Sequence, residues 1–125
     1  MDEAGFRDWL ERYFAAWRSN DRAEVEALFS EDAVYYVSPF QEPRRGRDEI
    51  VDVWISGGVQ PELRLEHRPL AFSGATGVAH WAASFVTEDG GARVDLDGLI
   101  LLEFDQDGRC RDHREWFAER IVEAG

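Results

Sequence analysis

The sequence predicts a single α+β domain over residues 1–125, in which three N-terminal helices pack on a strongly curved antiparallel β-sheet and form a cone. Three observations favour this fold class. Residues 11–34 read as two amphipathic helices that lead directly into a strand. A third helical segment follows, and the rest of the chain alternates strand patterns with Gly-containing turns. A length of 125 residues is enough for one domain with its own hydrophobic core.

Each of the three predicted helices has an apolar stripe or a start signal. The first has a stripe at helical spacing, formed by Phe6, Leu10, Tyr13 and Trp17. Asp21 begins the second helix, because its carboxylate can accept hydrogen bonds from the free N–H groups while Glu24 reaches back. Residues 30–32 are expected to end this helix. The third helix begins near Gly46 and has one apolar side, formed by Ile50, Val53 and Trp54.

Five segments are predicted as strands, because they are rich in β-branched and aromatic residues or alternate apolar with polar side chains. They are residues 33–37, 62–70, 78–87, 92–104 and 109–119. The strands at 78–87 and 92–104 carry apolar residues on both faces. Since the helices can cover only one face of the sheet, the other face needs a second cover. We therefore expect a homodimer formed through the outer face of the sheet.

The composition argues against several classes of protein. The net charge of -12, from 14 basic and 26 acidic residues, repels nucleic acid and anionic membranes. No apolar run approaches the roughly 20 residues that cross a bilayer. A single cysteine excludes an intrachain disulfide and no signal peptide opens the chain, so we expect a cytoplasmic protein. The three histidines lie on separate predicted strands without metal-ligand spacing, so we expect no metal.

Several short motifs occur in an order and spacing typical of one family. They are E-R-Y at 11–13, A-L-F at 27–29, E-D-A at 31–33, Ser38-Pro39, P-R-x-G-x-x-x-I at 43–50, Ser84-Phe85 and F-D-Q-D-G-R at 104–109. In these motifs the chain resembles the nuclear transport factor 2-like superfamily, in particular its SnoaL-like and ketosteroid-isomerase-like branch. The resemblance implies a cone that encloses one small-molecule cavity. It leaves the function open, because the superfamily includes isomerases, cyclases, epoxide hydrolases, dehydratases and binding modules.

The acid/base residues of ketosteroid isomerase are only partly present. That enzyme uses an Asp base and an oxyanion hole made of a Tyr and a protonated Asp. By the resemblance, Tyr13 matches the Tyr donor, whereas the position of the base falls on Ser38. Ile100 occupies the position of the second Asp. Asp97 lies three residues earlier, on the opposite face, and would reach the cavity only through a bulge at Gly98.

The last predicted strand offers a replacement for the missing acids. Aligned with the family, it turns three residues toward the cavity, His113, Glu115 and Phe117, and leaves four outside, Cys110, Asp112, Arg114 and Trp116. Alternation alone does not choose the face, because each face carries one large aromatic residue. An imidazole and a carboxylate on one face of a strand suit proton transfer near neutral pH. We expect His113 to be the general acid/base, held by Glu115, and Tyr13 to stabilise an oxyanion.

The expected substrate-binding residues are mainly aromatic, which favours a flat, apolar ligand. They are Trp17, Tyr35, Ser38, Trp54, Trp81, Phe85, Asp97 and Phe117. The first functional hypothesis is a cofactor-independent isomerase or cyclase that acts on an apolar cyclic ketone or a polyketide-like ring. The residues favour a hydrolase or dehydratase less than an isomerase or cyclase. The alternative is a non-catalytic ligand-binding or dimeric interaction module, which the loss of both family Asp residues motivates.

Overall fold

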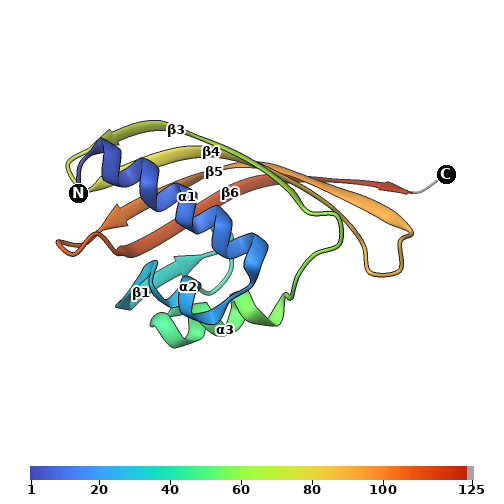
Figure 1. The fold of residues 1–125 in the computed structure, drawn as a ribbon, viewed down its shortest axis with the longest axis horizontal. Helices are drawn as coiled ribbons and strands as arrows, with labels where there is room; N and C mark the ends of the chain where they lie inside the picture. Colours follow the sequence, from blue (N-terminus) through green and yellow to red (C-terminus); the bar gives the residue numbers. More distant parts are fainter. Residues whose placement is uncertain (124–125) are drawn as a thin grey trace.

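The computed structural model describes residues 1–123 and contains one curved, open sheet with all helices on one side (Figure 1). The helices are α1 (Glu3–Ser19), α2 (Arg22–Glu26) and α3 (Arg47–Ser56). The strands are β1 (Phe29–Tyr36), β2 (Arg44–Arg45), β3 (Arg64–Ser73), β4 (Thr76–Val86), β5 (Ala92–Phe104) and β6 (Cys110–Glu123). Their order across the sheet is β2-β1-β6-β5-β4-β3. The predicted α+β class with three helices on a curved sheet is confirmed.

The sheet is mixed, because one of its pairings departs from the predicted antiparallel arrangement. Strands β3, β4, β5 and β6 form the expected antiparallel meander. Strand β1, however, pairs in parallel with β6, the last strand of the chain. A parallel pair needs a long crossover between its strands, and here α3 and the meander supply it. The short strand β2, which is not among the five predicted strands, pairs with β1 at the sheet edge.

The second helix ends earlier and the first strand begins earlier than the sequence predicts. The helix stops at Glu26 rather than at residues 30–32, and the strand starts at Phe29. The carbonyl of Leu28 explains the change, because it accepts hydrogen bonds from the Trp9 indole (3.1 Å) and from the Cys110 amide (2.9 Å). These contacts come from α1 and β6, so they outweigh the local helical pattern.

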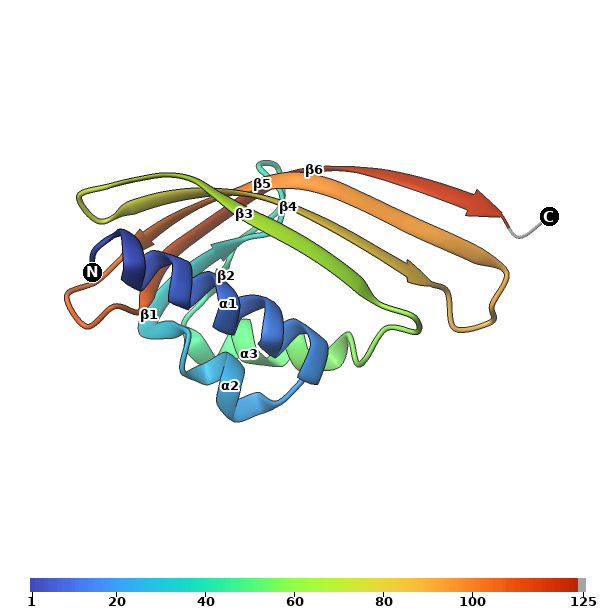
Figure 2. The ribbon, with the colours of Figure 1, turned by 45° about the horizontal axis from the view of Figure 1, so that its top comes forward.

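The core lies between α1 and the concave face of the sheet. The buried side of α1 carries aromatic and aliphatic residues that pack against Phe29, Phe72 and Phe104. Figure 2 shows that α1, α2 and α3 lie on one side of the sheet, and that the far ends of β4, β5 and β6 project beyond them. Among residues 1–123, no helix has the length and apolarity needed to cross a membrane.

Cys110 is fully buried, although the alignment with the family placed it outside. The pairing of β5 with β6 shifts register between Glu103 and Phe104, which brings Cys110 opposite Phe104. Such an irregularity adds one residue to one strand and reverses the alternation beyond it. From Asp112 onward the predicted alternation of β6 agrees with the structure, because Asp112 pairs with Glu103 on the outer face.

Gly98 permits the close approach of β5 and β6. It lies opposite Phe117, and a Cβ at this position would collide with the backbone oxygen of Trp116 and with Phe117 itself. We expect Gly98→Ala to lower the free energy of unfolding by about 1–3 kcal/mol, measured by urea denaturation. Gly57→Ala is the control, because its added Cβ would lie 3.5 Å from the Trp54 oxygen, an ordinary contact. Equal losses in the two variants would contradict this explanation.

Candidate functional site

A pocket of about 250 Å³ lies between α1, α3 and the inner face of the sheet. Its lining is mostly aromatic or small and contains one carboxylate, Glu115. The residues that line it are Tyr13, Trp17, Asn20, Tyr35, Val37, Val53, Trp54, Gly57, Gly58, Gln60, Trp81, Leu96, Glu115 and Phe117. Seven of the eleven residues expected from the sequence are in this set.

The register of β5 with β6 determines which side chains of β6 face inward. Glu115 lies opposite Ile100, and His113 lies opposite Leu102. Both partners on β5 are buried in the core. Since directly opposite residues of an antiparallel pair share a face, His113 and Glu115 lie on the inner side. This is the face that the family resemblance implied.

His113 lies behind the pocket wall rather than in the pocket. Its side chain is fully buried, and its Nε2 atom is 2.8 Å from the Tyr13 hydroxyl. The ring of Tyr35 stacks on the imidazole with centroids 4.1 Å apart. Burial lowers the pKa of His113 to about 3, so the imidazole is neutral at physiological pH. Within residues 1–123 it makes no hydrogen bond with Glu115, and this placement does not favour the acid/base role expected for His113.

Glu115 is the carboxyl group that reaches the pocket. Its side chain is half-buried, and burial raises its pKa from 4.5 to about 8, while a hydrogen bond with Tyr35 acts in the opposite direction. A carboxyl group with a pKa near the working pH can both give and take a proton. The geometry therefore favours Glu115, rather than His113, as the proton-transferring residue.

Two phenols accompany this carboxyl group. Tyr13 and Tyr35 are 3% and 7% exposed, and both line the pocket. Burial, together with the charge of Glu115, raises the pKa of each phenol well above its usual value of 10. Both side chains therefore keep their proton and remain hydrogen-bond donors.

The pocket wall contains most of the expected aromatic residues. The ring of Trp54 stands perpendicular to that of Tyr13, with centroids 4.9 Å apart. Trp81 is in contact with Trp17 on one side, at 5.6 Å between centroids, and with Phe117 on the other, at 5.9 Å. These rings form an apolar slot that suits a flat ligand.

Besides His113, three expected residues lie outside the pocket. Ser38 is in the turn after β1, where its carbonyl accepts a hydrogen bond from the Gln41 amide. Phe85 shares the inner face with Trp81 but lies four residues further along β4, beyond the pocket. Asp97 is on the outer face and pairs with His80 at 2.9 Å, because β5 keeps a continuous register through residue 98. The bulge that would have turned Asp97 inward is not formed.

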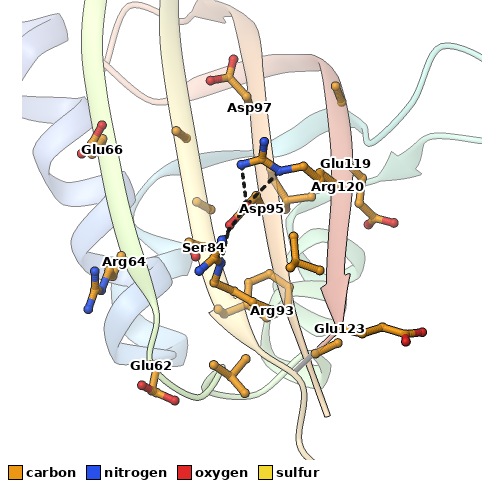
Figure 3. Close-up of a pocket in the computed structure, with 18 of the residues that line it drawn as sticks. Glu62, Arg64, Glu66, Ser84, Arg93, Asp95, Asp97, Glu119, Arg120 and Glu123 are labelled. Carbon is orange, nitrogen blue, oxygen red and sulfur yellow. Dashed lines mark hydrogen bonds and ion pairs between the residues drawn. The ribbon is translucent and has the colours of Figure 1, made fainter. Parts of the chain in front are cut away.

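A larger hollow lies on the other side of the sheet, near the far ends of β3–β6 (Figure 3). Charged side chains dominate its lining, and three of them form one network. Asp95 accepts from Arg120 at 2.8 Å and from Arg93 at 3.2 Å. Its charged side chains are mostly exposed, where ion pairs contribute little, and it lacks the row of aromatic side chains that lines the smaller pocket, so it is a weaker candidate for a substrate site.

Sequence reasoning missed the residues that form the mouth of the pocket. Asn20 caps α1 in the left-handed region, with φ 56°, and donates from its side chain to the Ile55 carbonyl. Gly57, Gly58 and Gln60 come from the connection between α3 and β3. A helix-ending Asn and a pair of glycines signal turns, but they give no indication that the turns meet over a pocket.

The chain belongs to the SnoaL-like domain family, whose model matches residues 10–113. The match runs from α1 to His113, and the family is part of the nuclear transport factor 2-like superfamily. It supports a small-molecule-binding protein. A comparison with curated protein sequences found no match.

Solved structures with the same fold include two described as epoxide hydrolases or related enzymes. The epoxide hydrolase/cyclase-like enzyme SalBIII, described in pyran ring formation in the polyether salinomycin, has a TM-score of 0.80 and 17% identity, over 98% of each chain. An M. tuberculosis LEH-like epoxide hydrolase has a TM-score of 0.70 and 20% identity, over 89% of this chain and 80% of its own. TsrD from Streptomyces laurentii has a TM-score of 0.75 and 17% identity, over 94% of this chain and 90% of its own. At these identities the likeness shows the fold alone.

Glu115 and His113 make the stability depend on pH in opposite directions. The pKa of Glu115 is raised from 4.5 to about 8, so its contribution is complete below pH 4.5 and is lost as the pH rises to about 8. The pKa of His113 is lowered from 6.5 to about 3, so its contribution is complete above pH 6.5 and is lost as the pH falls.

In the wild type, the contribution of Glu115 to the free energy of unfolding should fall between pH 5 and 8, by at most about 1.4 kcal/mol per pH unit. We expect Glu115→Gln to lack this fall. The reason is that Gln cannot release a proton as the pH rises. Urea denaturation at a series of pH values measures this slope. Glu119→Gln on the same strand is the control, because Glu119 is exposed and lies outside the pocket lining. A slope retained in Glu115→Gln would contradict the raised pKa.

Proposed function

We propose that this protein is a cofactor-independent acid/base enzyme, of the isomerase or cyclase type, that acts on an apolar cyclic ketone or a polyketide-like ring. The observation that carries the proposal is the position of Glu115, a carboxyl group with a pKa of about 8 inside an aromatic pocket. Ionised Glu115 removes a proton from the carbon next to the substrate carbonyl. The same carboxyl group then returns the proton to another carbon of the ring, so the reaction needs no external acid or base.

The two phenols stabilise the oxygen that becomes negative in this step. When the proton leaves carbon, the carbonyl oxygen gains the charge of an enolate. Tyr13 and Tyr35 line the same pocket as Glu115 and stay protonated, so their hydroxyl groups can donate to this oxygen. His113 is a positioning residue: with its proton on Nε2, the neutral imidazole donates to the Tyr13 oxygen, which leaves the Tyr13 O–H free to donate to the substrate.

The pocket favours an uncharged substrate. Within the described residues its lining contains no Arg, Lys or His, and its only carboxyl group is that of Glu115, among aromatic side chains. An anionic ligand would lose its hydration there without gaining a cationic partner. The net charge of -12 disfavours the approach of anions as well. A neutral ketone meets neither penalty.

We expect Glu115→Gln to slow proton exchange at the carbon next to the carbonyl of a bound ketone by about a hundredfold or more, with little change in affinity. The amide retains the shape of the side chain but cannot take the proton. Deuterium incorporation from D₂O into decalone, a fused-ring ketone, measures the rate by NMR, and it should rise with pH toward about 8. Glu119→Gln is again the control. Binding of decalone to the wild type without exchange would favour the non-catalytic binding module.

The outer face of the sheet supports a proposed homodimer. Leu99 and Trp116 are directly opposite each other on this face, and they are 43% and 46% exposed. Around them acidic and basic side chains alternate and pair, as in the 3.0 Å contact of Arg114 with Asp112. The face is therefore mixed in charge although the chain carries -12, so two copies can meet here with little repulsion.

We expect Trp116→Glu to shift the protein from dimer to monomer, because it places a charge at the apolar centre of the proposed interface. Sedimentation velocity over a range of protein concentrations measures the change. Phe40→Glu is the control, since Phe40 is 99% exposed in the loop between β1 and β2. A wild-type protein that stays monomeric at high concentration would contradict the proposed interface.

A further inference from the structure

The mouth of the pocket is closed on one side by the connection between α3 and β3. Gln60 lies in the middle of this segment, and its side-chain oxygen accepts a hydrogen bond from the Trp17 indole at 2.7 Å. The last turn of α3, which leads into the segment, is attached to the end of α1, because Asn20 donates to the Ile55 carbonyl. The end of the segment is attached to β4 by the bond from the Val86 amide to the Pro61 carbonyl, 2.9 Å. Gln60 is therefore held at the mouth by a defined partner.

The chemistry of the Trp17 contact determines which way the Gln60 amide points. An indole nitrogen can only donate a hydrogen bond, so the amide oxygen must face it. The NH₂ end of the Gln60 amide is therefore the one not bonded to Trp17, and within residues 1–123 it has no protein acceptor. Since Gln60 lines the pocket and is half-buried, this donor is available to a bound molecule.

The pocket then has hydrogen-bond donors at two levels. The phenols of Tyr13 and Tyr35 form the lower level, beside Glu115. Trp17 lies one turn further along α1 than Tyr13, about 6 Å along the helix axis. Because Gln60 is hydrogen-bonded to Trp17, its NH₂ group belongs to this upper level. Between the two levels the wall is formed by indole and phenyl rings. A ligand that uses both levels has two oxygen acceptors separated by an apolar ring.

We propose that Gln60 is a specificity-determining residue, whose NH₂ group donates to a second oxygen of the substrate while the reacting carbonyl lies against Tyr13 and Glu115. The inference rests on the proposed function and adds the substrate class: a ring compound with two oxygens, such as a diketone or hydroxyketone. A single oxygen would leave the Gln60 donor without a partner once the ring has displaced water from the mouth. Trp17 acts as a positioning residue by fixing the amide.

Two substitutions separate the loss of the Gln60 donor from the loss of the Trp17 contact that orients it. Gln60→Met keeps the length of the side chain and removes the NH₂ group. Trp17→Phe keeps an aromatic ring and removes the indole N–H, which leaves the amide free to turn. Val59→Ala is the matched control, because Val59 is the preceding residue of the same segment, is 65% exposed and does not line the pocket.

The test measures the affinities of decalone and of the matching diketone, decalindione, by isothermal titration calorimetry. We expect the ratio of the two affinities to shift by about three- to tenfold toward decalone in Gln60→Met, the effect of one lost hydrogen bond, and by a smaller factor in Trp17→Phe. Val59→Ala should leave the ratio unchanged. In the wild type, decalindione should also shift the side-chain amide resonances of Gln60 in a ¹⁵N-labelled sample, whereas decalone should not.

Two failures can be told apart. If both ketones bind and their affinity ratio is the same in the wild type and in Gln60→Met, the role of Gln60 is wrong and the pocket assignment stands. If neither ketone binds the wild type, the proposed function is wrong and the role of Gln60 falls with it. Binding that depends on Gln60 but shows no dependence of proton exchange on Glu115 would support the specificity role and contradict the catalytic one.

Discussion

The hydrogen bond between Tyr13 and His113 connects the first helix with the last strand, across 100 residues of sequence. It is buried, so both partners would lose hydration without compensation if the helix shifted or β6 changed register. The bond therefore ties the position of α1 to the alternation of β6. That alternation in turn directs Glu115 and Phe117 toward the pocket, and the position of α1 places Trp17 at its mouth. Most of the pocket geometry depends on this one buried contact.

Burial has opposite effects on the two titratable residues of β6. It lowers the pKa of His113 to about 3 and raises that of Glu115 to about 8, because a low-dielectric environment disfavours whichever form is charged. The residue expected to be the proton carrier is thus neutral over the physiological range. Its expected helper titrates near neutral pH instead. The same physical cause explains why His113 suits a supporting role behind the wall and why Glu115 suits chemistry inside it.

Strand alternation divides the sheet between two tasks. On the inner face, β4, β5 and β6 present Trp81, Leu96 and Glu115 to the pocket. On the outer face, the same strands carry paired charges around exposed apolar residues, as in the contact of Arg114 with Asp112. Two carboxylates that were both candidates for the site, Asp97 and Glu115, therefore lie on opposite faces of the sheet. A one-residue change of register would exchange the two sets.

The sequence by itself determined the fold class, the three helices, the strand at 92–104 and the inward set on β6, because these follow from local periodicity and from the family motifs. It also named seven residues of the pocket, among them Tyr13, Trp54 and Glu115. Only the tertiary structure decided the parallel pairing of β1 with β6, the burial of Cys110 and the outward position of Asp97. It also decided that Gln60 contacts Trp17 at the mouth of the pocket, and that Glu115, rather than His113, has a pKa near neutral pH because of burial. These features depend on contacts between distant segments and on the exclusion of water, and neither leaves a periodic signal in the chain.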